Sequence, residues 1–507
     1  MLSKSISLGL KGIDAIPVVI EVDVIRGLPG FNIVGLPDSV IKESKDRIRP
    51  AVENSGFEFM PKNFVVNLAP AAFKKQGANF DLAIAIAILK TTGQINLDID
   101  KIPMVGELSL TGEVRPVRGV ISMVLALYEK GYTDVIVPFE NRNEASIIDQ
   151  INVFPVKSLF ETLSVFNGEM KPYACQKNNS DGNYRKKLYD FQDICGQENV
   201  KRAIEIAAAG HHNILMYGPP GSGKSMIAKS IPSILPALEK ASSITTTMIH
   251  SIAGENIPDG GLVVDPPFRS PHHTASDIAL VGGGTIPRVG EITLAHNGVL
   301  FLDEFIEFKN DVIQALRQPL EDRVITVSRA AGTVRFPADF MLVASTNPCR
   351  CGFLFDDEIE CKCSSIQLKK YFGKIAGPIL ERFDIEIYVP RVPYRKLMGK
   401  VKSETSNDIK ERIERTRKIQ IKRFAGETIM FNSLMSSPMV KKYCSLSDEM
   451  NEMLEDSMKK LKLSARSFFR VLKVARTIAD LEESPEIKKE HVFEALSYKS
   501  INKYYGF

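Results

Sequence analysis

Neither charge sign dominates this sequence, because 65 lysine and arginine residues stand against 61 aspartate and glutamate residues, for a formal net charge of +4. Bulk charge therefore permits a nucleic-acid partner without indicating one. No stretch approaches the roughly 18–20 uninterrupted apolar residues that cross a membrane. The start, Met1–Leu8, lacks an apolar core followed by a small-residue cleavage site, so we expect neither a membrane span nor a signal peptide.

Cysteine is also scarce. Seven cysteines among 507 residues do not make a disulfide scaffold, and their odd number argues against one. We therefore expect a cytoplasmic protein with reduced thiols. The composition is otherwise that of an ordinary soluble protein, 44% hydrophobic and 25% charged, and the chain is long enough for about three domains.

Composition and periodicity divide the chain into four segments, which are residues 1–167, 168–189, 190–393 and 394–507. The first alternates short apolar runs with helical stretches, with strands expected at 64–68 and 134–138 and a buried helix at 81–89. The second is polar and turn-rich, which is typical of a linker. The third is the expected α/β core. The last is rich in lysine, arginine and glutamate and has helical spacing.

The first motif of the core is a phosphate-binding loop. An apolar strand, 212–217, leads directly into GPPGSGKS, and a helical pattern follows. Glycines let backbone amides close around phosphates, Lys224 reaches the β and γ oxygens, and Ser225 offers a hydroxyl to Mg²⁺. Strand, motif and helix in this order predict an ATP site rather than a chance match. The loop residues are Gly218, Pro219, Pro220, Gly221, Ser222, Gly223, Lys224 and Ser225.

Two further strands complete the predicted site. The apolar run 298–302 ends in Asp303 and Glu304. Asp303 is expected to hold Mg²⁺, and Glu304 to orient and polarise the attacking water. A third apolar strand, 340–347, ends in Asn347, whose amide can bond the γ-phosphate or the water; a simple turn cap before Pro348 is the alternative.

Several longer strings resemble one family of ATPases. The core resembles the AAA+ ATPases, and within them the Mg-chelatase-like ComM/YifB proteins, over nearly the whole chain. The strings that carry this resemblance are Asp193–Gln197, Gly210–Met216, Phe268–Thr274, Gly290–Glu304, Thr346–Gly352, Ser464–Arg466 and Val474–Asp480.

The resemblance implies a homo-oligomeric ring, a hexamer, in which a neighbouring subunit completes each active site. The segment Gly377–Asp384 resembles the arginine-finger segment, which makes Arg382 the expected finger. Arg466 resembles the sensor that contacts the γ-phosphate from the same subunit, with Arg470, one turn further on, as a substitute. The alternative for each is an ordinary surface arginine, paired or solvated.

Two insertions resemble those of this AAA+ branch. Residues 282–288 resemble the helix-2 insertion, and 324–335 are typical of a hairpin with its turn at 330–332. If both project into the pore of a ring, Arg288, Arg329 and Arg335 can follow a DNA backbone. Solvated hairpin charge is the alternative.

Four of the cysteines form two Cys-x-Cys pairs, Cys349 with Cys351 and Cys361 with Cys363, with nine residues between the pairs. Four thiolates satisfy a tetrahedral structural zinc site, although the one-residue spacing is tighter than usual. Four reduced thiols in a loop are the alternative interpretation.

The N-terminal segment resembles the proteolytic domain of Lon proteases at 105–119 and 131–141. Such cleavage needs a serine activated by a lysine. Where the resemblance would place the serine and the lysine, this chain has the runs Asn79–Leu82 and Gly119–Ser122, so we expect a non-proteolytic domain. The expected fold is therefore α/β throughout, with a Lon-protease-like (ribosomal S5 domain 2-like) N-terminal domain, an AAA+ P-loop NTPase core and a helical C-terminal lid.

Three functions fit these patterns. The resemblance favours an ATP- and Mg²⁺-dependent motor on DNA, specifically a branch-migration helicase in homologous recombination or natural transformation. A chelatase-type motor that remodels a protein partner is the second. An ATP-dependent Lon-like protease is the third, and the missing serine and lysine argue against it.

Overall fold

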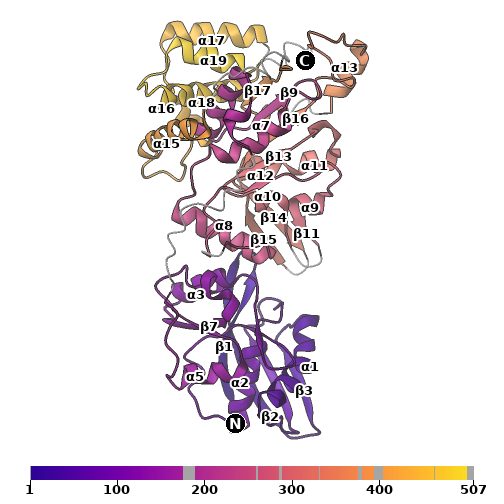
Figure 1. Cartoon of the computed structure of the whole chain (residues 1–507), viewed down its shortest axis with the longest axis vertical. Coiled ribbons are helices and arrows are strands. Elements are labelled where there is room, and N and C mark those ends of the chain that lie inside the picture. Colours follow the sequence, from indigo (N-terminus) through magenta and orange to yellow (C-terminus); the bar gives the residue numbers. More distant parts are fainter. Residues whose placement is uncertain are drawn as a thin grey trace.

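A computed structural model describes residues 2–174, 189–258, 261–284, 288–329, 332–374, 379–392, 404–461 and 463–499. The molecule is elongated, with the N-terminal residues at one end and the C-terminal helices at the other (Figure 1). Most of the expected linker, residues 175–188, lies outside the described residues. None of the described helices is long and apolar enough to cross a membrane.

The N-terminal part is built on a four-stranded sheet with the order β1-β2-β4-β3, in which only β3 and β4 are parallel. The expected strands at 64–68 and 134–138 and the expected helix at 81–89 are confirmed as β4, β7 and α2. Helix α2 is buried along almost its whole length, which explains its uniformly apolar sequence. The elements are β1 (Ser3–Lys11), β2 (Asp14–Ile25), β3 (Gly30–Val34), α1 (Ser39–Asn54), β4 (Asn63–Ala69), α2 (Asp81–Thr91), β5 (Glu107–Leu108), β6 (Val114–Arg115), α3 (Val120–Glu129), β7 (Asp134–Pro138), η1 (Phe139–Asn141), α4 (Arg142–Ala145), β8 (Asn152–Val156) and α5 (Leu159–Phe166).

A five-stranded parallel sheet, with the order β10-β13-β16-β9-β17, forms the centre of the molecule. Because all five strands are parallel, their carboxyl ends meet at one edge, where α/β proteins bind ligands. The strands are β9 (Ile214–Tyr217), β10 (Phe268–Arg269), β13 (Val299–Leu302), β16 (Met341–Thr346) and β17 (Ile385–Tyr388). The sheet confirms a mixed α/β core.

Helices and two hairpins surround this sheet. They are η2 (Phe191–Asp193), α6 (Glu198–Gly210), α7 (Lys224–Ser230), η3 (Ile231–Ser233), α8 (Lys240–Ala253), α9 (Asp277–Val281), β11 (Gly282–Gly283), β12 (Arg288–Val289), α10 (Glu291–Leu294), η4 (Phe305–Glu307), α11 (Asn310–Ala315), α12 (Arg317–Asp322), β14 (Val324–Arg329), β15 (Gly332–Pro337), α13 (Ser365–Phe372) and η5 (Leu380–Arg382). Strands β11 and β12 pair, as do β14 and β15.

The two faces of the sheet belong to different cores, because successive residues of a strand point to opposite faces. On one face Leu215 and Leu300 pack with the buried side chains of α9–α12 and of the β14–β15 hairpin. On the other face Ile214 and Val299 share a core with α6 and with the C-terminal helices. Those helices are α15 (Ser406–Arg423), η6 (Asn432–Leu434), α16 (Ser437–Tyr443), α17 (Asp448–Leu461), α18 (Ala465–Leu481) and α19 (Lys489–Ser497).

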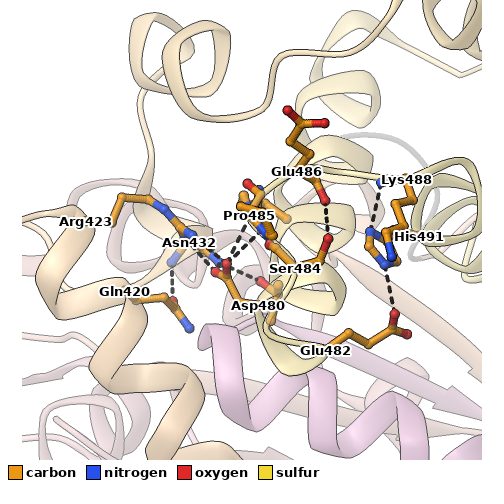
Figure 2. Close-up of polar contacts among 12 residues, drawn as sticks. Gln420, Arg423, Asn432, Asp480, Glu482, Ser484, Pro485, Glu486, Lys488 and His491 are labelled. Atoms are coloured by element: carbon orange, nitrogen blue, oxygen red, sulfur yellow. Dashed lines mark hydrogen bonds and ion pairs between the residues drawn. The ribbon is translucent and has the colours of Figure 1, made fainter.

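A buried carboxylate ties the C-terminal helices together. Asp480, near the end of α18, accepts hydrogen bonds from Arg423 Nη1 at 2.6 Å and from Asn432 Nδ2 at 2.8 Å (Figure 2). Two residues after Asp480, the Glu482 carboxylate lies 3.0 Å from Nε2 of His491, which belongs to α19. These contacts fix the end of α15, the turn η6 and the start of α19 against α18.

Helix α8 joins the N-terminal part to the core. The buried hydroxyl of Ser251 donates to the Glu144 carboxylate at 2.5 Å and accepts from the Gly119 N–H at 2.7 Å. Burial raises the pKa of Glu144 despite these hydrogen bonds. A second contact lies at the β1–β2 turn, where a Cβ on Gly12 would stand 2.6 Å from Val334 of β15. The two parts therefore touch at more than one place in the described structure.

Candidate nucleotide-binding site

The phosphate-binding loop follows β9 directly, and its glycines are required by the backbone. Gly221 and Gly223 have φ angles of +77° and +88°, in the left-handed region that favours glycine. A Cβ on Gly218 would stand 2.2 Å from the carbonyl oxygen of Val389. The loop can thus hold this shape only with the predicted glycine spacing.

Lys224 is the first residue of α7 and is buried. Its Nζ donates hydrogen bonds to the carbonyl oxygens of Gly218 at 2.8 Å and Pro219 at 2.9 Å, so the ammonium curls back into the loop. Burial lowers the pKa of Lys224 to about 8, against the opposing effect of the Asp303 and Glu304 carboxylates. The loop therefore holds a cation that is poorly solvated and would gain from an anionic ligand.

Asp303 lies beside Ser225, the other residue expected to hold Mg²⁺. Ser225 Oγ donates to Asp303 Oδ2 at 2.6 Å, and Ser345, on the neighbouring strand β16, donates to the other carboxylate oxygen. A hydroxyl and a carboxylate at this spacing are the hard oxygen ligands that Mg²⁺ takes in phosphate sites. The residues present therefore fit a Mg²⁺ ion between Ser225 and Asp303. The contact from Ser345 was not predicted, because only Asn347, the residue that ends this strand, was assigned a role from the sequence.

Glu304 is held by a residue that the sequence analysis did not assign. Its backbone has a φ of +53°, and its side chain is 57% exposed. One carboxylate oxygen lies 3.2 Å from Nδ1 of His273, whose ring packs on that of His272 at 4.1 Å between centroids. His273 follows β10, so the carboxyl ends of β10 and β13 bring the two side chains together. The string 268–274 was visible in the sequence, but only as part of the family resemblance.

Asn347 directly follows β16, which lies between β9 and β13 in the sheet. It therefore lies at the same edge as the phosphate-binding loop and Asp303. This placement is compatible with the predicted contact to a γ-phosphate.

Arg382 and Arg466 lie together at the opposite edge of the sheet. Arg382 is buried in η5, just before the first residue of β17, and its Nη2 lies 2.6 Å from Glu321 Oε1. Arg466 is 65% exposed at the start of α18 and lies 3.7 Å from the same Glu321 oxygen. The sequence analysis assigned Arg466 to its own subunit's γ-phosphate, whereas its partners here are Glu321 and Glu381. Arg470, the substitute, pairs with Asp384.

The predicted DNA-contacting arginines lie on the two hairpins. Arg288 is exposed at the start of β12, and Arg335 is exposed on β15, opposite Thr326. The Arg329 side chain and both turns, 285–287 and 330–331, lie outside the described residues. Figure 1 shows the hairpins on the side of the core that faces the N-terminal part.

The four paired cysteines converge. Their sulfur atoms all lie within 4.8 Å of one another. Cys349 is buried, and the other three are half-buried. The six cysteines in the described part of the chain are all free thiols.

One residue in each of the two runs that correspond to the protease serine and lysine makes a buried structural hydrogen bond. The Asn79 amide is buried and donates to the Leu8 carbonyl at 2.5 Å. The N–H of Ile121, also buried, donates to Glu144 at 2.9 Å, the carboxylate that contacts Ser251 of the core.

Three family models match the chain, and all three describe subunit ChlI of magnesium chelatase. The model of magnesium chelatase subunit ChlI matches residues 190–397, a second ChlI model matches residues 20–141, and that of the ChlI C-terminal region matches residues 403–499. The Magnesium-chelatase 38 kDa subunit of Rhodobacter capsulatus is 27% identical, over 33% of this chain and 53% of its own length.

Full-length relatives are more similar. Competence protein ComM of Haemophilus influenzae is 41% identical, over 97% of this chain and 96% of its own. The YifB protein of Escherichia coli is 39% identical, over 97% of this chain and 96% of its own. Because the similarity spans both chains almost from end to end, the protein belongs to the ComM/YifB family of Mg-chelatase-like AAA+ ATPases.

Proposed function

We propose that this protein is a hexameric, ATP-driven motor that moves on DNA, as a branch-migration helicase in recombination or natural transformation. Family membership indicates an ATPase that uses ATP and Mg²⁺ and assembles into an oligomer. The proposal that this motor acts on DNA rests on the end-to-end similarity to Competence protein ComM. The formal net charge of +4 does not by itself indicate a DNA partner.

The proposed chemistry divides among the residues at the sheet edge. Lys224 neutralises the β and γ phosphates. Ser225 and Asp303 would hold Mg²⁺, which when bound would supply positive charge to offset the charge that develops on the phosphates. Glu304 accepts a proton from the attacking water or orients it, with Asn347 alongside. Because Glu304 lies against His273 in this state, we infer that this contact must open before Glu304 can engage the water.

The two arginines support a site shared between subunits. Arg382 and Arg466 both lie at Glu321, on the edge of the sheet away from the phosphate-binding loop. We therefore propose that both cations act on the neighbouring subunit's nucleotide, where they stabilise charge on the transferring phosphoryl group. For Arg466 this replaces the same-subunit role expected from the sequence.

We further propose that the four segments predicted from the sequence are functional units, and that residues 1–167 are a Lon-like domain without protease activity. The buried, structurally engaged Asn79 and Ile121 support the second point. Two hydrogen bonds through Ser251 link this domain to α8 of the core, which gives it a route to respond to the motor.

The first experiment measures the ATPase rate with no DNA and with single-stranded, duplex and four-way-junction DNA, using Glu304→Gln as the blank. We expect stimulation by DNA, greatest with the junction. Arg288→Ala and Arg335→Ala should reduce that stimulation, whereas Arg49→Ala, a matched exposed arginine on α1, should not. An active ATPase indifferent to every DNA would refute the DNA motor.

That negative outcome would favour the second candidate, a chelatase-type motor that remodels a protein partner. The specific observation in its favour is the ChlI family model over residues 190–397. A partner-stimulated, DNA-independent ATPase rate would identify it.

A further inference from the structure

The sulfur atoms of the loop that carries the four cysteines are spaced closely enough to share one metal ion. Sulfur–sulfur distances are 3.3 Å for Cys349–Cys351, 3.7 Å for Cys349–Cys361 and 3.6 Å for Cys351–Cys361. A tetrahedron with Zn–S bonds of about 2.3 Å has sulfur–sulfur edges of about 3.8 Å. A disulfide requires about 2.05 Å, and an iron–sulfur cluster needs a wider cage because its own atoms lie between the thiolates. The spacing therefore fits a single tetrahedral ion.

Backbone amides face these sulfurs, as they do around thiolates that bind metal. The N–H groups of Leu354 and Gly352 face the Cys349 sulfur, and that of Gly352 donates to the Cys349 carbonyl oxygen at 3.0 Å. Cys351 accepts from those of Phe353 and Lys362. Such hydrogen bonds stabilise thiolate charge and orient the ligands. Four protonated thiols would gain less from these N–H groups than thiolates that share a cation.

The same loop also forms part of a cavity beside the phosphate-binding loop. This cavity, of about 510 Å³, is lined by Pro220 and the three residues that follow it, together with Glu358 and Arg391. Glu358 comes from between the two cysteine pairs. Gly352 packs against the phosphate-binding loop, because a Cβ there would stand 2.8 Å from Pro220 Cδ.

Two further contacts hold the loop against the end of β17. Arg391 Nε lies 2.7 Å from Asp356 Oδ2. The Tyr388 hydroxyl donates to the Phe355 carbonyl at 2.7 Å. Asn347 stands only two residues before Cys349. A metal at the cysteines would therefore fix both a wall of the cavity and the end of β16.

We propose that Cys349, Cys351, Cys361 and Cys363 bind one Zn²⁺ ion, and that this ion holds residues 349–363 in place as a wall of the nucleotide pocket. The metal is structural, since four protein ligands leave no open position for substrate. The coupling to nucleotide rests on the proposed ATPase function, whereas the metal site does not. Loss of the ion should free Glu358 and Arg391 and weaken nucleotide binding, because ligand binding must then order these side chains again.

The metal is tested on the full-length protein purified without chelator. Elemental analysis should find one zinc per chain, and Cys361→Ser/Cys363→Ser should contain little. Cys444→Ala, which removes a buried thiol at the end of α16, should retain the metal. Replacement by Co²⁺ should give the visible and thiolate charge-transfer bands of tetrahedral cobalt. Protein with neither zinc nor such bands would overturn the proposal.

The coupling is tested by binding a fluorescent ADP to the zinc-loaded, chelator-treated and zinc-restored wild-type protein. We expect affinity to fall about tenfold on zinc removal and to recover on zinc return. Unchanged affinity after complete zinc removal would overturn the coupling. Failure of every form, zinc-loaded included, to bind nucleotide would instead refute the ATPase function, while the zinc content would still be measured.

Discussion

Nucleotide affinity should fall steeply as pH rises above 8, because of Lys224. Burial lowers the pKa of this ammonium to about 8 in the absence of ligand. A polyphosphate placed against it favours the charged form, so the pKa must rise in the complex. The complex then holds more protons than the free protein between these two pKa values. Affinity is therefore greatest below pH 8 and declines as the free protein loses its proton.

The magnitude follows from the fraction of free protein that is still protonated. With a pKa of about 8, that fraction is about 0.9 at pH 7 and about 0.1 at pH 9, so the dissociation constant should rise about tenfold. ADP and ATP are fully ionised above about pH 7.5, so protonation of the nucleotide does not change the dissociation constant above that pH.

Equilibrium binding of fluorescent ADP between pH 7 and 9.5, with Mg²⁺ present, measures this slope. Lys224→Arg gives the control, since a guanidinium stays charged throughout this range and any binding it retains should not change with pH. A dissociation constant for the wild-type protein that stays flat or falls between pH 8 and 9.5 would refute the reasoning from Lys224 burial.

Three other predictions follow from single contacts. Glu304→Gln should bind ATP normally but lower turnover by about 10²–10⁴-fold, as measured by phosphate release; a normal rate would exclude Glu304 from the chemistry. Ser251→Ala should weaken docking of the N-terminal part by about 2–4 kcal/mol, because Glu144 and a buried N–H each lose a partner. Limited proteolysis should then cleave between the parts faster than in Thr245→Ala, a control that removes a half-buried hydroxyl elsewhere on α8; equal rates would contradict the docking role. Arg382→Ala should be inactive alone, yet mixing it with Glu304→Gln subunits should restore some ATPase activity, and no recovery would argue against a finger acting between subunits.

Local sequence predicted the parts of the site that depend on chain continuity. The phosphate-binding loop, and the Asp303–Glu304 pair at the end of β13, each follow a strand directly, so their positions were fixed once the strands were recognised. The partners of these residues were not predictable in this way. Ser345 reaches Asp303 only because β16 is the neighbour of β13, and His273 reaches Glu304 only because β10 is the other neighbour. Strand order is a tertiary property that spacing does not encode.

Arg466 illustrates the same limit on a larger scale. Its motif indicated a sensor, but where it lies depends on how α18 packs against the sheet. The structure brings it to Glu321 rather than to the phosphate-binding loop. The cysteines were predicted as two pairs, and the sequence could not show that the loop between them approaches Pro220.

The core shared by the sheet and the C-terminal helices constrains how this ATPase can deform. Residues of β9, β13 and β16 and of helices α15, α18 and α19 belong to one continuous apolar cluster. Swinging the C-terminal helices away from the sheet would expose that cluster to water, at about 25 cal/mol for each Å² uncovered. The sheet and these helices should therefore move as one rigid block during the ATP cycle. If the protein works as the proposed hexameric motor, its movement must then occur where such blocks adjoin, between subunits and along the Ser251 junction with the N-terminal part.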